Sequence, residues 1–291
     1  MTARLLLLCP GQGGQHAGMF DLARSHAGAR AFLDNCALAN DAQSLFDNRV
    51  AQPAIVAATL AIWIALRDSL GPVALVAGYS IGELAAYGVA GAFSPEDTVR
   101  LAGARAALMD DAAAGVAQGL AAVSGIDVDA VRAWIDVAIV TGHDSCIVGG
   151  TRVQLDALPA RLPFARIQAL PVAVASHTAL MHEAVAPFVR LLKDAAFTPQ
   201  RFPVLAGIDA TRVLYRDTAI DRLARQLDEP IAWSACMDAA DEAGMTVALE
   251  LGPGNALARM LQNRHPHIAC RTIADFHTLD GITQWVARQM A

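Results

Sequence analysis

The pentapeptide Gly-Tyr-Ser-Ile-Gly at 78–82 carries the strongest chemical signal in this chain. An apolar run at 73–77 precedes it and a helix-like run at 83–89 follows it, which places the serine on a tight strand-to-helix turn. Such a turn exposes the hydroxyl of Ser80. The backbone N–H of Ile81 then lies at a helix N-terminus, where it can stabilise an oxyanion. The pattern predicts acyl chemistry through a covalent acyl-serine.

A serine hydroxyl without activation is a poor nucleophile at neutral pH, so Ser80 needs a general base. The chain has eight histidines, and His177 stands apart because it closes the extended run at 170–175, where an inserted segment returns to the main domain. A histidine at the end of a strand that faces a cleft is well placed to take a proton. Taken alone, a histidine at this position is more often an ordinary polar residue, and a general base is the alternative.

A glycine-rich element, Pro-Gly-Gln-Gly-Gly-Gln at 10–15, follows the first expected strand directly. Its glycine spacing matches neither the dinucleotide-binding pattern nor the Walker pattern, so it does not indicate a nucleotide loop. Beside a serine turn, a better physical use is to present a backbone N–H. We expect the N–H groups of Gln12 and Ile81 to form an oxyanion hole. The alternative is a plain strand-to-helix turn.

Arg105 lies on an expected helix among small and apolar residues. An arginine in this setting is either a solvated helix charge or a buried clamp for an anion. A clamp would suit a substrate carboxylate, because the guanidinium fork binds a carboxylate through two parallel hydrogen bonds.

The composition indicates a chain with a large apolar core and argues against disorder. Of the 291 residues, 55% are hydrophobic and 17% are charged. The net charge of −6 does not favour nucleic acid as a partner. The five cysteines are scattered and lack any Cys-x-x-Cys spacing, so neither a metal site nor a disulfide framework is expected. The expected compartment is the cytoplasm.

Two apolar runs could be mistaken for membrane signals. The run Leu5–Leu8 is too short for a signal peptide and is expected to form a buried first strand. The run Pro53–Leu66 is too short to span a bilayer, and we expect a core helix with Pro53 in its first turn. No association with a membrane is therefore expected.

The order of the expected elements indicates an α/β fold with a parallel sheet in the larger part of the chain. Between 117 and 176 the order becomes β-α-β-β-α-β, which is the ferredoxin-like split unit. We therefore predict a large α/β-hydrolase-like domain formed by 1–116 and 177–291, with a small inserted ferredoxin-like subdomain at 117–176. The main elements are extended runs at 4–9, 73–77, 164–174 and 247–250 and helices at 53–66, 83–89, 95–113 and 255–263.

These elements together resemble one family, the malonyl-CoA:acyl-carrier-protein transacylases and related acyltransferase domains. The likeness covers nearly the whole chain, and the motifs occur in the family's order, which is far more specific than any single motif. The motifs are Pro10–Gly13, Gln52-Pro53, Ser80 with Glu83, Arg105 with Met109, Ser176-His177, Arg225-Gln226-Leu227 with Pro230 and Trp233, and Glu250-x-Gly252-Pro253-Gly254.

The resemblance implies a ping-pong acyl transfer. Ser80 would attack the thioester of malonyl-CoA with His177 as base, and the amides of Gln12 and Ile81 would hold the oxyanion. The family uses a Ser–His pair whose histidine is oriented from the segment that matches Gln226. CoA would leave, and the thiol of a carrier protein's prosthetic group would take the acyl group.

The resemblance also implies a site for the acyl group. Arg105 would clamp the free carboxylate of malonyl, and Gln52, Tyr79 and Met109 match other substrate-binding positions. The implied partners are malonyl-CoA and an acyl carrier protein. A CoA thioester is the substrate, and no tightly bound cofactor or metal is expected.

Two departures from the family pattern point to one branch. The family usually has histidine before the serine, where this chain has Tyr79, and its Asn-x-Pro-x-Gln stretch is replaced by Gly142–Cys146. With residues 9–20, these changes look most like the epsilon subunit of bacterial malonate decarboxylase. That subunit loads malonyl onto the decarboxylase's own carrier, which bears a phosphoribosyl-dephospho-CoA group. The alternatives are a malonyl-CoA transacylase of fatty-acid or polyketide synthesis, a serine thioesterase, and a non-catalytic carrier-binding subunit.

The segment 151–201 carries positive charge inside an acidic chain, with six basic residues against three acidic ones. Carrier proteins of this type are usually acidic, so the segment is a candidate docking surface. The alternative is scattered solvated charge. The basic residues are Arg152, Arg161, Arg166, Arg190, Lys193 and Arg201.

Overall fold

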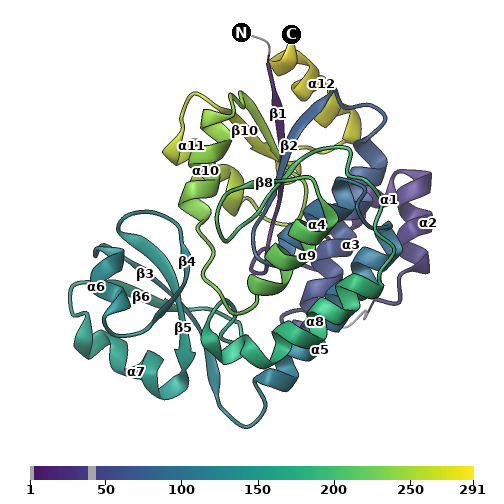
Figure 1. Ribbon diagram of the computed structural model, residues 1–291. Coiled ribbons are helices and arrows are strands. Elements are labelled where there is room, and N and C mark those ends of the chain that lie inside the picture. The colour runs from purple at the N-terminus through teal and green to yellow at the C-terminus, as the bar shows by residue number, and fades with distance from the viewer. Residues whose placement is uncertain (1–2, 39–43) are drawn as a thin grey trace.

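Two β-sheets organise the computed structural model, which describes residues 3–38 and 44–291 (Figure 1). In these residues the larger sheet has six strands in the order β10-β9-β1-β2-β7-β8, and its neighbouring pairs are parallel except β7–β8. The predicted α/β fold with a parallel sheet is therefore confirmed. The strands are β1 (Leu5–Cys9), β2 (Val73–Gly78), β7 (Val204–Leu205), β8 (Arg212–Val213), β9 (Val247–Glu250) and β10 (Ala269–Thr272).

Helices cover both faces of this larger sheet. They are α1 (Asp21–Arg24), α2 (Ala27–Asn35), α3 (Asn48–Leu66), α4 (Ile81–Val89), α5 (Pro95–Ala112), α8 (His182–Asp194), α9 (Arg216–Arg225), α10 (Trp233–Glu242), α11 (Ala256–Arg264) and α12 (Leu279–Met290). Side chains alternate along a strand, so neighbours in β1 face opposite ways. Leu5 and Leu7 pack into the core built by α3, α4 and α5, whereas Leu6 and Leu8 pack toward α10 and α11.

The second sheet is antiparallel, with the strand order β4-β5-β3-β6. Along the chain its elements follow one another as β-α-β-β-α-β. They are β3 (Gln118–Ser124), α6 (Val128–Arg132), β4 (Asp136–Val140), β5 (Ser145–Thr151), α7 (Arg152–Arg161) and β6 (Arg166–Ala169).

The two faces of the second sheet have different neighbours. Val123 and Val148 pack with α6 and α7 on one face. Leu120 of β3 points to the other face, where it joins the apolar cluster that α10 and α11 form on the larger sheet. Leu120 and Ile147 also line the cavity described below, so α6 and α7 lie on the side of the sheet away from that cavity.

Helix α3 begins earlier than the predicted core helix. Because it starts at Asn48, Pro53 is its sixth residue, and the prediction that Pro53 lies in the first turn was wrong. The proline lacks the N–H that would otherwise bond the carbonyl of Arg49, and packing along the rest of the helix compensates. In the described part of the chain, α3 is the one helix long and apolar enough to cross a membrane, and most of it is buried in the core.

Several short extended elements differ from the sequence prediction. The strands β7 and β8 have two residues each, which is too short to show any alternation of apolar and polar side chains. Conversely, the run at 164–174 was predicted to be extended, but only Arg166–Ala169 form a strand. The residues after Ala169 form a loop that leads to His177.

Candidate active site

Ser80 lies at a sharp turn between the end of β2 and the start of α4. Its φ of 55° falls in the left-handed region, which a serine adopts only when the surroundings enforce it. A Cβ on Gly78 would lie 2.2 Å from the carbonyl oxygen of Gly82, and a Cβ on Gly82 would lie 2.1 Å from that of Cys9. Glycine at both positions therefore lets the helix approach the strands closely enough to form the turn.

The side chains of Ser80 and His177 meet, with Ser80 Oγ 2.8 Å from His177 Nε2. The other ring nitrogen, Nδ1, lies 2.5 Å from the backbone carbonyl oxygen of Gln226. A carbonyl oxygen only accepts hydrogen bonds, so Nδ1 carries the proton and donates it there. Nε2 is then free to accept the proton of the Ser80 hydroxyl, as a general base must.

The imidazole of His177 is kept neutral by its surroundings. The residue is 1% exposed, and burial is the main reason that its pKa is lowered from 6.5 to about 3. The positive charge of Arg105 lowers this pKa further, and the hydrogen bond to Gln226 opposes the shift. At neutral pH the base is therefore unprotonated and able to take a proton.

His177 does not end a strand, so that part of the prediction was wrong. Strand β6 ends at Ala169, and His177 follows in a loop with a φ of 64°. Its backbone N–H donates to the carbonyl oxygen of Leu227 at 2.8 Å, and its ring donates to that of Gln226. Two adjacent carbonyls after α9 thus hold both the backbone and the ring of the base.

The predicted oxyanion-hole residues come from the two loops that meet at the nucleophile. Ile81 is the first residue of α4, and Gln12 lies in the glycine-rich loop after β1. Cys9 pairs with Gly78, so this loop and the serine turn leave the sheet at the same end. In the described part of the chain, neither the N–H of Gln12 nor that of Ile81 has a hydrogen-bond acceptor. Both donors are available to a carbonyl oxygen that becomes negative during the reaction.

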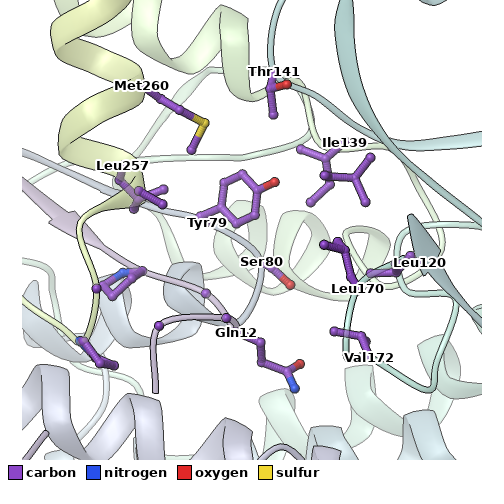
Figure 2. Close-up of a pocket in the computed structure, with 18 of the residues that line it drawn as sticks. Gln12, Tyr79, Ser80, Leu120, Ile139, Thr141, Leu170, Val172, Leu257 and Met260 are labelled. Atoms are coloured by element: carbon purple, nitrogen blue, oxygen red, sulfur yellow. The ribbon is translucent and has the colours of Figure 1, made fainter. Parts of the chain in front are cut away.

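A cavity of about 480 Å³ opens beside Ser80 and His177 (Figure 2). Most of its wall is apolar, and a wall of this kind excludes water and strengthens electrostatic interactions inside. No group of three His, Cys, Asp or Glu side chains able to hold a metal occurs among the residues that the structure describes. The apolar lining includes Tyr79, Leu120, Ile139, Ile147, Leu170, Val172, Leu257 and Met260.

Arg105 is buried near the dyad, at 2% exposure, so it is not a solvated helix charge. Its Nη1 donates to Gln52 Oε1 at 2.7 Å, and its Nη2 donates to Gln226 Oε1 at 3.5 Å. No carboxylate in the described part of the chain forms an ion pair with it. A buried guanidinium without a carboxylate is costly, and such a group is typical of a site that receives an anion.

Gln52 contacts both Arg105 and Met109, and none of these three residues lines the cavity. Gln52 Nε2 donates to Asn48 Oδ1 at 2.6 Å and lies 3.5 Å from Met109 Sδ. These contacts orient the carbonyl oxygen of Gln52 toward the guanidinium. The contacts favour a role for Gln52 and Met109 in positioning Arg105, and their role as substrate contacts stays a prediction. Asn48 is a supporting residue that no motif indicated.

Tyr79 directly precedes the nucleophile, and it forms part of the cavity wall. Its ring packs edge-on against Trp233, with the centroids 5.2 Å apart and the planes at 81°. Figure 2 shows its hydroxyl directed toward Ile139, below Thr141. Burial raises the pKa of this phenol, so it stays neutral.

Glu83 is a buried acid that belongs to the serine motif, although the motif by itself gives it no role. It is 0% exposed, and its Oε2 accepts hydrogen bonds from the N–H of Gly207 at 2.8 Å and from the side-chain amide of Gln226. Gln226 thus holds His177 through its backbone and joins Arg105 to Glu83 through its side chain. The sequence held one sign of this role, since Glu83 is the single acid in an otherwise apolar helix. An acidic residue is rarely buried without a partner, so a buried Glu83 implies a partner.

The basic residues of the segment proposed for docking lie on elements that pack in different parts of the structure. Arg152 and Arg161 lie on α7, which packs on the face of the second sheet away from the cavity, and Arg161 stacks on Trp134 at 4.8 Å. Arg190 and Lys193 lie on α8, which packs into the core with α3, α4 and α5. This arrangement favours the alternative, scattered solvated charge.

Comparison with known sequences gives a consistent result over nearly the whole length. The acyl transferase domain family matches residues 6–267. The malonyl CoA-acyl carrier protein transacylase of Mycobacterium tuberculosis is 32% identical over 298 residues, covering 96% of this chain and 99% of the relative. The protein of the same name from Escherichia coli is 28% identical over 279 residues, covering 85% of this chain and 88% of the relative.

Solved structures agree with these relatives. The crystal structure of MCAT from Mycobacterium tuberculosis superposes with a TM-score of 0.89 at 30% identity, covering 96% of this chain and 99% of that one. The acyl-carrier-protein S-malonyltransferase of Burkholderia pseudomallei gives a TM-score of 0.89 at 26% identity, covering 97% and 99%. The chain belongs to the acyl transferase domain family.

Proposed function

We propose that this protein is a malonyl-CoA:acyl-carrier-protein S-malonyltransferase that holds the malonyl group as an ester on Ser80. The proposal is carried by the 2.8 Å contact between Ser80 Oγ and His177 Nε2, beside a buried Arg105 that no carboxylate of the described chain pairs with. The pair forms an acyl-enzyme, and the arginine selects an acyl group that has its own carboxylate. The names of the relatives from Mycobacterium tuberculosis and Escherichia coli support the same activity.

In the first half-reaction, His177 Nε2 takes the hydroxyl proton of Ser80 while Oγ attacks the thioester carbonyl of malonyl-CoA. The carbonyl oxygen becomes an oxyanion, which the N–H groups of Gln12 and Ile81 stabilise. When the carbon–sulfur bond breaks, the sulfur of CoA takes the proton from His177. The malonyl group remains on Ser80, with its carboxylate against Arg105.

In the second half-reaction, the thiol of a carrier's prosthetic group gives its proton to His177 and attacks the ester carbonyl. The same two N–H groups hold the oxyanion, and Ser80 leaves with the proton. His177 must be neutral at the start of each half-reaction, and its lowered pKa meets that requirement. The bond broken in the substrate and the bond formed in the product are both thioesters, so no other energy source is needed.

Labelled malonyl-CoA tests this proposal against its rivals. Without a carrier, a malonyltransferase accumulates malonyl-Ser80, which peptide mass spectrometry locates. A thioesterase releases free malonate instead, and a non-catalytic carrier-binding subunit takes up no label. Ser80→Ala is the control and should form no ester. Label on another residue, or rapid release of malonate, would overturn the proposal.

The identity of the carrier is the finer part of the proposal. The transacylase relatives support a carrier of fatty-acid or polyketide synthesis. A polyketide biosynthesis protein of Burkholderia thailandensis, 31% identical over 90% of this chain and 24% of its own length, supports the same kind of carrier. Tyr79 and Gly142–Cys146 are the features that favour the malonate decarboxylase carrier, and they weigh less than these relatives. Malonyl-Ser80 is offered a carrier with a phosphopantetheine arm and one with a phosphoribosyl-dephospho-CoA arm. The faster acceptor identifies the branch.

Three expectations about the whole chain belong with this proposal. An α/β-hydrolase-like large domain with a ferredoxin-like subdomain at 117–176 is supported by the serine turn and by the strand order β4-β5-β3-β6. A cytoplasmic location is supported by the five free cysteines. The absence of a tightly bound cofactor is supported by the reaction steps, which need only side chains and backbone groups of this chain.

A further inference from the structure

Glu83 lies within the site, yet no step of the transfer uses it. It is fully buried on α4, in the first turn after Ser80. Its Oε2 accepts two hydrogen bonds, from the backbone N–H of Gly207 at 2.8 Å and from the amide of Gln226. Its Oε1 is also buried but has no hydrogen-bond partner.

This one-sided hydrogen bonding favours the neutral acid. A carboxylate spreads its charge over both oxygens, and a charged oxygen left unpaired in the interior costs far more than an unpaired hydroxyl. The two donors at Oε2 suit the carbonyl oxygen of an acid, which leaves Oε1 as the hydroxyl. Burial raises the pKa of Glu83 from 4.5 to about 8, in agreement with the geometry.

Glu83 and Arg105 are linked without touching. Arg105 donates to Gln226 Oε1 at 3.5 Å, and the amide nitrogen of the same side chain donates to Glu83. Each group shifts the pKa of the other in the direction that favours opposite charges. Burial lowers the pKa of Arg105 to about 10, so the guanidinium stays charged over the range in which Glu83 titrates.

The other titratable groups that face Glu83 do not balance Arg105 in its place. Asp209 raises the pKa of Glu83, but its own charge is paired with Arg222 at 2.7 Å. Tyr87 on the same helix and Cys236 on α10 have pKa values raised mainly by burial, and both are neutral. Glu83 is thus the group that sets the charge opposite Arg105.

We propose that Glu83 is the charge-balancing residue of the acyl site, and that its neutral form reserves Arg105 for an acyl group that brings a carboxylate. This role rests on the proposed malonyl transfer. With malonyl on Arg105, an ionised Glu83 would leave one unbalanced negative charge in the interior. With an uncharged acyl group, an ionised Glu83 would balance Arg105 instead. Ionisation of Glu83 therefore disfavours malonyl and favours acetyl.

The pH dependence of acyl loading tests this role. Formation of acyl-Ser80 is measured with malonyl-CoA and with acetyl-CoA, and the ratio of the two rates is followed as the pH rises. In the wild-type chain the ratio is expected to fall above about pH 8, approaching tenfold per pH unit as for one titrating group. Glu83→Gln keeps the shape of the side chain without the proton, so the fall should disappear. A fall that persists in this variant would overturn the proposal.

Glu250→Gln is the matched control. Glu250 is also fully buried, burial raises its pKa to about 7, and it borders the cavity. Its carboxyl accepts from the N–H groups of Leu257 and Ala258 at the start of α11, and not from Gln226. This variant should retain the fall in the ratio. If Glu250→Gln removes the fall instead, Glu250 is the titrating group and the proposal is wrong.

Proton exchange gives a readout that does not depend on the stability of a variant. Malonyl and acetyl loading release the same CoA thiol, so the difference in protons exchanged near pH 8 reports the acyl site. Malonyl loading should take up more protons than acetyl loading, because the arriving carboxylate raises the pKa of Glu83 further. Equal exchange would overturn the proposal. Failure of the malonyl-transfer function would look different, since no malonyl-Ser80 would form at any pH.

Discussion

Ser80 Oγ and His177 Nε2 lie 2.8 Å apart although 97 residues separate them in the sequence. Ser80 is held by the turn into α4, and His177 is held by the backbone carbonyls of the turn after α9. Both residues have positive φ values, which cost free energy that the surrounding fold must offset. The two side chains therefore meet in a preset geometry and act as one unit.

Removing either Ser80 or His177 should lower kcat/KM for malonyl transfer nearly as much as removing both side chains. Ser80→Ala and His177→Ala are each expected to lower kcat/KM for malonyl transfer by about four orders of magnitude or more. The double variant should add little, because the remaining partner has no function alone. Steady-state transfer to a carrier measures this, with thermal unfolding as the control for folding. Losses that multiply in the double variant would contradict a shared unit.

The low pKa of His177 should place the acid limit of activity unusually low. With a pKa near 3, the base stays neutral at about pH 5, where a histidine with the ordinary value of 6.5 would be mostly protonated. We expect kcat/KM to be nearly constant from neutral pH down to about pH 5. A pH–rate profile for acyl loading measures this. An acid limb between pH 6 and 7 would show that the free enzyme holds an ordinary histidine.

The same shift affects stability, and its sign follows from linkage. Between about pH 6.5 and pH 3 the unfolded chain binds a proton on His177 that the folded chain does not, so this contribution to stability is lost as the pH falls. Glu83 acts in the opposite direction: its contribution is full below about pH 4.5 and is lost as the pH rises through about 8. Denaturant unfolding of His177→Ala should show a shallower acid loss than the wild-type chain.

The position of His177 shows what the sequence could and could not predict. The serine turn could be predicted because the strand, the two glycines and the helix follow one another directly in the sequence around 78–82. The geometry of the turn therefore depends on neighbouring residues alone. The histidine is singled out by its place after an extended run, and only the order of motifs makes it the expected base. Its loop conformation depends on Leu227 and Gln226, which follow a distant helix. No local pattern indicates which carbonyl of a remote turn will hold a ring.

The burial of Arg105 illustrates a second limit. An arginine among alanines looks the same in a solvated helix and in a buried one. What distinguishes them is the packing of α3 against α5, which places Gln52 against the guanidinium. The network through Gln226 to Glu83 likewise joins three helices or turns that are far apart in the chain. Contacts of this kind follow from the tertiary fold and leave no periodic signal.

Arg105 should decide which acyl group is accepted. Arg105→Ala is expected to lower malonyl loading by about two to four orders of magnitude and to leave acetyl loading unchanged or faster, because only malonyl loses a charged contact. Arg105→Lys keeps the positive charge but loses the two parallel hydrogen bonds of the guanidinium. Its rate of malonyl loading should lie between those of the wild-type chain and Arg105→Ala. Arg100→Ala, an exposed arginine on the same helix, is the control and should change neither rate. Equal losses for malonyl and acetyl would show that the arginine only supports the fold.

Gly82 should be the most restrictive position of the serine turn. A Cβ there would lie 2.1 Å from the carbonyl oxygen of Cys9 and 2.7 Å from that of Pro10, and these backbone atoms cannot move without shifting the sheet. Gly82→Ala is expected to lower the free energy of unfolding by at least about 3 kcal/mol. Any folded fraction should load malonyl slowly, because displacement of α4 moves both Ser80 and the N–H of Ile81.

Gly103→Ala is the matched control, since Gly103 lies within α5 and a Cβ there has no atom within 4 Å. This variant is expected to raise the free energy of unfolding by about 0.5–1 kcal/mol, as alanine does in an open helix position. Denaturant unfolding compares the stability of the two variants. Mass spectrometry measures how fast each forms acyl-Ser80, which depends on the geometry of the serine turn. If Gly82→Ala matched the wild-type chain in both measurements, the close approach of α4 to β1 would not be what holds the nucleophile in place.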